Sequence, residues 1–168
     1  MSTFLVVGRT ALAAVLLSAL APPRAQAGMP AFVQDVSPEA VPAVKVVDAF
    51  SAAIKAARID SAKQLLDPNV LVLESGGSER SRDQYLEEHA VADAAYMQGT
   101  TQDLRYRKAR VAGDLAWVGT ESILTSKKSG KPSLNMSTET MILHKTADGW
   151  KIVHIHWSSR AVPEQHDR

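Results

Sequence analysis

Residues 148–158 read Asp-Gly-Trp-Lys-Ile-Val-His-Ile-His-Trp-Ser, and this stretch decides the fold. An Asp-Gly turn opens it, and the residues that follow alternate between two faces with the period of a β-strand. One face, called the histidine face below, carries Trp150, Ile152, His154, His156 and Ser158. Val153, Ile155 and Trp157 share the other face. Both faces contain apolar side chains, so the alternation alone does not decide which of them points to the interior.

Three more strand-like runs lie directly upstream of this strand. Each turn between neighbouring runs contains glycine, and the short spacing predicts a consecutive antiparallel meander. The expected strands are residues 101–111, 115–125, 133–145 and 150–159, with turns at 112–114, 127–132 and 147–149.

The first half of the domain has helical periodicity instead. Apolar residues recur at helical spacing over residues 43–57, and a short second helix is expected to begin near Asp60. A brief strand at 70–73 follows, and the capping box at residues 81–84 predicts a third helix that runs to about Met97. Helices followed by a meander predict an α+β fold in which the helices cover one side of a curved sheet.

The stretch 148–158 resembles the terminal strand of SnoaL-like members of the nuclear transport factor 2 superfamily, which includes the ketosteroid isomerases. A related His-x-His-x-Ser ending is found in the association domain of calcium/calmodulin-dependent kinase. The resemblance covers about residues 43–160 and implies a cone-shaped barrel with a small-molecule pocket and a dimer formed through the open sheet face. No catalytic set of the superfamily's isomerases, epoxide hydrolases or dehydratases matches this sequence residue by residue.

The N-terminus has the pattern of a secretory signal. Arg9 precedes an uncharged apolar run at 10–21, and Ala25-Gln26-Ala27 forms a small-x-small cleavage site. The apolar run is too short for a stable membrane span, so we expect a periplasmic or secreted protein with no membrane segment after cleavage. The expected organisation is a signal peptide at 1–27, a mobile lead at 28–42, the SnoaL-like domain at 43–160 and a polar tail at 161–168.

Composition excludes several other classes of protein. The chain has 19 Lys and Arg against 18 Asp and Glu; cleavage removes Arg9 and Arg24 and no acid, which leaves 17 basic and 18 acidic residues. A nucleic-acid binder normally shows a basic face or stripe, and nothing in this nearly neutral chain demands one, so we expect no nucleic-acid partner. The sequence has no cysteine, so no disulfide stabilises the fold and no lipid anchor is attached to a cysteine.

We expect the histidine face to line the pocket, with His154, His156 and Ser158 at its open end. A hairpin loop of two or four residues would place Glu139 on this face, because directly paired residues point the same way. A loop of three residues would bring Thr138 and Thr140 there instead. On the neighbouring strand, Trp117 and Glu121 share one face. We interpret Trp117 as core and Glu121 as a pocket residue, and both are candidates for ligand contact.

The expected third helix supplies further polar candidates. His89, Asp93 and Tyr96 lie along one face at spacings of three and four. A carboxylate four residues from an imidazole can fix its tautomer, so we interpret Asp93 as the partner of His89. In this hypothesis His89 or His156 is the base that transfers a proton on an apolar ligand, Tyr96 contacts the ligand, and no cofactor is required.

Two other functions remain open at this stage. His154 and His156, at positions i and i+2 of one strand, can share a copper or zinc ion, with His89 or Glu139 completing the site. Alternatively, the chain is a dimeric interaction module without catalysis. Whether it is an enzyme or a ligand carrier does not follow from these residues.

Overall fold

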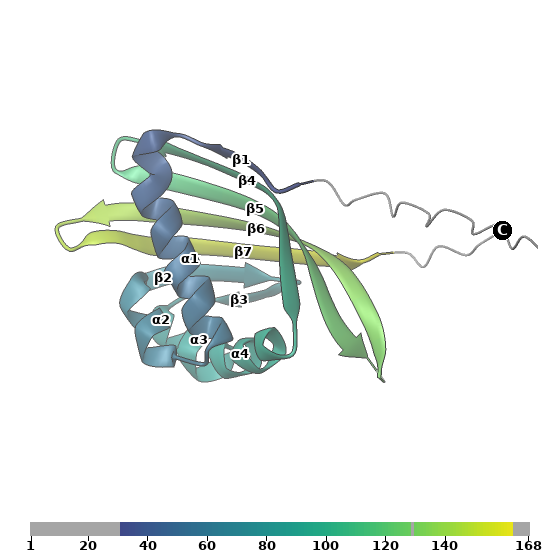
Figure 1. The fold of residues 1–168 in the computed structure, drawn as a ribbon. Coiled ribbons are helices and arrows are strands. Elements are labelled where there is room, and N and C mark those ends of the chain that lie inside the picture. Colours follow the sequence, from purple (N-terminus) through teal and green to yellow (C-terminus); the bar gives the residue numbers. More distant parts are fainter. Residues whose placement is uncertain (1–30, 129, 163–168) are drawn as a thin grey trace, which may run out of the picture.

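The computed structural model describes residues 31–128 and 130–162, so the signal peptide expected at 1–27 and most of the polar tail lie outside the described residues. In these two ranges seven strands form one sheet in the order β1-β4-β5-β6-β7-β2-β3. The strands are β1 (Val33–Val36), β2 (Leu66–Glu74), β3 (Gly77–Glu79), β4 (Thr101–Ala112), β5 (Leu115–Lys128), β6 (Lys131–Thr146) and β7 (Gly149–Ala161). The sheet is curled and unclosed, as Figure 1 shows. The predicted α+β class and the four-strand meander are confirmed.

Within the described residues, four α-helices and a short 3-10 segment accompany the sheet: η1 (Pro38–Ala40), α1 (Val41–Lys55), α2 (Ile59–Leu65), α3 (Arg82–Glu88) and α4 (Ala90–Gln98). Helix α1 crosses one face of the sheet, while α2, α3 and α4 gather near β2 and β3 (Figure 1). The apolar residues of α1 recur at helical spacing and form one buried stripe against the sheet. This stripe consists of Ala43, Val47, Phe50 and Ile54.

The inward face of the meander completes this core. Buried apolar residues alternate along the strands and pair across them, as Met141 does with Ile155 and Leu143 with Ile152. The opposite face, called the outer face below, is not covered by any described helix and carries half-exposed Trp117. No described helix has the length and apolar character of a membrane span.

The expected mobile lead at 28–42 is wrong over its described part. Residues 33–36 form β1, which pairs in parallel with β4, and helix α1 has already begun at Val41. Asp35 fixes this edge strand, since its carboxylate accepts a 2.5 Å hydrogen bond from Arg110 and lies 3.3 Å from Lys108. A four-residue edge strand held by pairing and charge needs no apolar period, so the sequence pattern does not reveal it.

The expected single helix over residues 81–97 is divided in two. Its start is confirmed, because the Ser81 hydroxyl accepts a hydrogen bond from the backbone N–H of Gln84 at 3.1 Å. The backbone then leaves helical geometry at His89, where φ is −121° and ψ is −35°. Neither proline nor glycine marks this break, which coincides with a 2.5 Å contact between His89 and Glu79 on β3.

Candidate functional site

A cavity of about 110 Å³ lies between α1, α4 and the inward face of the sheet. Three carboxylates, Glu74, Asp93 and Glu139, share it with largely apolar neighbours. The remaining lining residues are Phe50, Ser51, Ile54, Tyr96, Met97, Gln102, Leu124 and Trp157. An apolar cavity with a few convergent polar groups is the usual form of a small-molecule site, although this one is smaller than most.

A β-bulge in β7 decides which side chains reach the cavity. Thr146 pairs with Gly149 around a two-residue turn, but Leu143 pairs with Ile152 while Ile142 pairs with His154, which leaves Val153 unpaired. One extra residue reverses the facing of every residue beyond it. Ile155 is therefore buried in the core and Trp157 reaches the cavity.

The expectation that the histidine face lines the pocket is consequently wrong. His156 and Ser158 are exposed on the outer face, and His154 bonds through Nδ1 to the backbone carbonyl of Leu71 at 2.9 Å. The register instead pairs Thr140 with His156 and Thr138 with Ser158, so the two threonines join the histidines, the arrangement expected for a three-residue loop. A two-residue turn followed by a bulge gives the same result.

Glu139 reaches the cavity from the inward face of β6. It pairs with Trp157 in the register, and the indole Nε1–H donates a hydrogen bond to Glu139 Oε2 at 2.8 Å. Burial raises the pKa of Glu139, against the lowering effects of the Trp157 hydrogen bond and of the Arg107 charge. Arg107 is itself bound to Asp48 at 2.6 Å, so its charge is shared between two carboxylates.

Asp93 lies across the cavity on α4. The Tyr85 hydroxyl donates a hydrogen bond to Asp93 Oδ2 at 3.0 Å, and Tyr85 is fully buried among Phe50 and Trp157, with ring centroids 6.2–6.4 Å apart. Burial raises the pKa of Asp93, while the Tyr85 hydrogen bond and the His89 charge lower it. Burial also raises the pKa of Glu74, and the Asp93 charge adds to this effect.

The structure brings together only part of the predicted site. Asp93, Tyr96 and Glu139 line the cavity. His89 does not: it lies in a second cavity of about 210 Å³, which shares Glu74, Asp93 and Trp157 with the first. Because the helix breaks at His89, Asp93 bonds to Tyr85 and the His89 imidazole bonds to Glu79, so the expected His89–Asp93 pair is wrong.

The structure also bears on the residues expected to contact a ligand from β5 and on the histidines expected to share a metal ion. Trp117 and Glu121 are exposed on the outer face, so Trp117 is not core and Glu121 does not reach the cavity. His89, His154 and His156 do not form a group of ligand atoms within 4.8 Å of one another in the described part of the chain.

Some lining residues were not identified from the sequence. Phe50 belongs to the apolar stripe expected over residues 43–57, and Trp157 belongs to the strand face opposite the expected pocket. The signal for Trp157 lies in the alternative of a three-residue loop, since that register pairs Trp157 with Glu139. Glu79 gave no signal, because its burial arises from β3, a three-residue strand that the sequence pattern does not predict.

Comparison with known proteins agrees with this geometry. Residues 44–163 match the model of the SnoaL-like domain. The fold is similar to a suspected ketosteroid isomerase from Shewanella frigidimarina, with 34% identity, a TM-score of 0.67 and coverage of 74% of this chain and 99% of that one. No curated protein matches the chain significantly.

Two more distant structures share the fold alone. A CaMKII hub from S. rosetta is 22% identical with a TM-score of 0.59, over 70% of this chain and 94% of that one. A suspected dehydratase of the NTF2-like family from Streptomyces avermitilis is 19% identical with a TM-score of 0.57, over 71% of this chain and 94% of that one.

Proposed function

The chain belongs to the SnoaL-like domain family, and we propose that its cavity binds a small apolar ketone and moves a proton on the carbon next to the carbonyl. The fold supports ligand binding or an isomerase- or dehydratase-type function. The observation that carries the finer proposal is that Asp93 and Glu139, two carboxyls with raised pKa, line one apolar cavity.

The two carboxyls suit different roles. The Tyr85 hydrogen bond and the His89 charge favour the ionised form of Asp93, which suits a base that removes the proton. Burial has the largest effect on the pKa of Glu139 and raises it, while the cation that lowers it, Arg107, is paired with Asp48. A neutral Glu139 carboxyl can donate a hydrogen bond to the carbonyl oxygen as negative charge develops there.

Cavity size restricts the ligand. A cavity of about 150 Å³ is known to hold benzene, so the 110 Å³ here accepts about one small ring. A ligand as large as a steroid would have to extend into the second cavity past Asp93 and Trp157. The name of the Shewanella frigidimarina protein supports the reaction type more than the size of the substrate.

The test is the isomerisation of 3-cyclohexen-1-one to 2-cyclohexen-1-one, which removes a proton from C2 and returns one to C4. The conjugated product is followed by its ultraviolet absorbance. We expect turnover by the purified protein, and a loss of roughly 100-fold or more in Asp93→Asn and Glu139→Gln, as for other positioned acids and bases. Glu121→Gln, which changes an exposed carboxylate of the same sheet, is the matched control and should be unaffected.

Two results would contradict the proposal. One is equal turnover by all three variants; the other is no turnover together with no shift of cavity resonances when cyclohexanone is titrated into labelled protein. Shifted resonances without turnover would reject the proton-transfer step and leave a ligand carrier, the other function that the fold supports.

We further propose that the protein acts after export and as a homodimer. The N-terminal pattern around Arg9 and 25–27 supports export. The uncovered outer face, with Trp117 and Met136 each about 40% exposed, supports association with a second copy. The hub neighbour adds the precedent of an oligomer built from this fold.

A further inference from the structure

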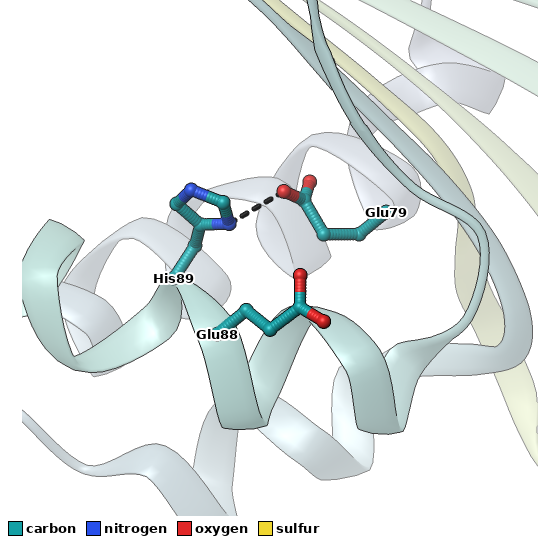
Figure 2. Close-up of side chains that lie close together, drawn as sticks. All are labelled: Glu79, Glu88 and His89. Atoms are coloured by element: carbon teal, nitrogen blue, oxygen red, sulfur yellow. Dashed lines mark ion pairs between the residues drawn. The ribbon is translucent and has the colours of Figure 1, made fainter.

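We propose a divalent metal site of the zinc type at Glu79, Glu88 and His89, on the junction between α3 and α4. Figure 2 shows three side chains that converge: Glu79 from β3, Glu88 from the end of α3, and His89 from the junction with α4. Their ligand atoms all lie within 4.8 Å of one another. This site differs from the His154–His156 hypothesis, and it does not depend on the ketone proposed for the first cavity.

The buried member of the group is Glu79. Its side chain is 6% exposed, and its partner is His89 Nδ1 at 2.5 Å. Within the described residues no lysine or arginine forms an ion pair with Glu79. A buried carboxylate is costly unless a charge compensates it, and the group that faces Glu79 is the half-exposed imidazole of His89. A bound cation would satisfy Glu79 and accept the imidazole as a second ligand.

The surroundings add negative charge without a fixed counter-charge. The second cavity is lined by Glu74, Glu79 and Asp93 together with His89, and none of its described lining residues is lysine or arginine. Carboxylates gathered at one cavity repel each other, and a divalent cation relieves that repulsion. The second cavity is therefore favourable for a cation and unfavourable for an anionic ligand.

The chain also positions the exposed ligands. Gln84 lies one helical turn before Glu88, and its Nε2 donates to both carboxylate oxygens of Glu88 at 3.3–3.4 Å. The helix break at His89 sends Glu88 and His89 toward the same point, although consecutive residues of an intact helix diverge by about 100°. A supporting hydrogen bond that orients a carboxylate is typical of metal ligands.

The distances suit zinc after small side-chain rotations. Zinc holds nitrogen and oxygen ligands at about 2.0–2.2 Å, so the ligand atoms of a tetrahedral site lie roughly 3.4 Å apart. The Glu79–His89 pair would have to open by about 1 Å as the shared proton leaves. Three protein ligands leave a fourth position for water, and one imidazole with two carboxylates suits zinc better than calcium or magnesium.

The test is calorimetric titration of untagged, chelator-treated protein with Zn²⁺. We expect one equivalent to bind, and Glu88→Gln and His89→Gln each to weaken the affinity at least tenfold. Both side chains are exposed, so these variants should fold. Glu79→Gln should abolish binding, with near-ultraviolet circular dichroism to confirm its fold. Glu87→Gln, an exposed neighbour outside the group, should bind like the wild type.

A spectroscopic measurement separates the site from nonspecific binding. Co²⁺ in a tetrahedral site gives strong visible absorption, and it should appear in the wild type and disappear in His89→Gln. Absence of stoichiometric binding would overturn the proposal. So would binding that is unchanged in the Glu88 and His89 variants, or binding that is lost instead in His156→Asn, which would place the metal on the outer face.

Discussion

Glu139 is the residue at which burial and hydrogen bonding oppose each other most directly. The Trp157 indole stabilises its ionised form, yet burial outweighs this and raises the pKa above its usual 4.5. A carboxyl whose pKa is higher in the folded chain than in the unfolded chain is protonated more readily when folded. Its contribution to stability is therefore complete below about pH 4.5 and is lost as the pH rises toward the raised value.

A Glu139→Gln variant should remove this loss, because glutamine cannot ionise. Its free energy of unfolding should fall less than that of the wild type as the pH rises from 4 to 8. Urea unfolding at several pH values measures the difference, and Glu121→Gln is the control. Parallel curves for wild type and Glu139→Gln would show that Glu139 titrates normally.

Asp93 offers a second residue-level test. Because the Tyr85 hydroxyl lowers the pKa of Asp93, Tyr85→Phe should raise that pKa further while the ring keeps its contacts with Phe50 and Trp157. Titration of the carboxyl carbon by NMR measures this change. Tyr106 lies on the outer face, so Tyr106→Phe should leave the pKa of Asp93 unchanged. A lowered pKa of Asp93 in Tyr85→Phe would contradict the assigned hydrogen bond.

Among the elements, α3 depends most clearly on a single cap. Ser81→Ala removes the hydroxyl that accepts from the Gln84 N–H and should cost about 1 kcal/mol of unfolding free energy. Chemical denaturation measures it, with Ser61→Ala as the matched control because Ser61 is an exposed residue inside α2. Equal effects of both changes would mean that the cap does not stabilise the helix.

The elements also show what the sequence can predict. The four long strands and the start of α3 follow from local signals, namely alternation, glycine turns and a capping box, and the structure confirms them. The bulge at Val153 is visible only in the pairing of β7 with β6, and the break at His89 coincides with its contact to Glu79 on β3, so no local pattern marks either. For this reason the sequence predicts the wrong positions for several site residues. The bulge reverses the facing of His154 and Trp157, and the break separates His89 from Asp93.

At the scale of the whole molecule, the outer face gives a test of assembly. If two copies pack through it, Trp117→Lys should convert a dimer to a monomer, since a charge would be buried in an apolar interface. Light scattering after size exclusion measures the mass. Val91→Lys is the control, because Val91 is 68% exposed on α4, away from this face. A wild-type protein that is monomeric at high concentration would reject the homodimer.

The bulge at Val153 in β7 has a consequence for comparing this chain with its relatives. A strand with the same letters but without the bulge, in which Val153 paired in the ladder, would turn Trp157 outward and present His154 and His156 to the cavity, without any substitution. The presence or absence of one bulge in this strand can thus exchange the indole of Trp157 for imidazole side chains in the cavity lining. Relatives aligned without a gap at this point can differ in chemistry while their letters agree.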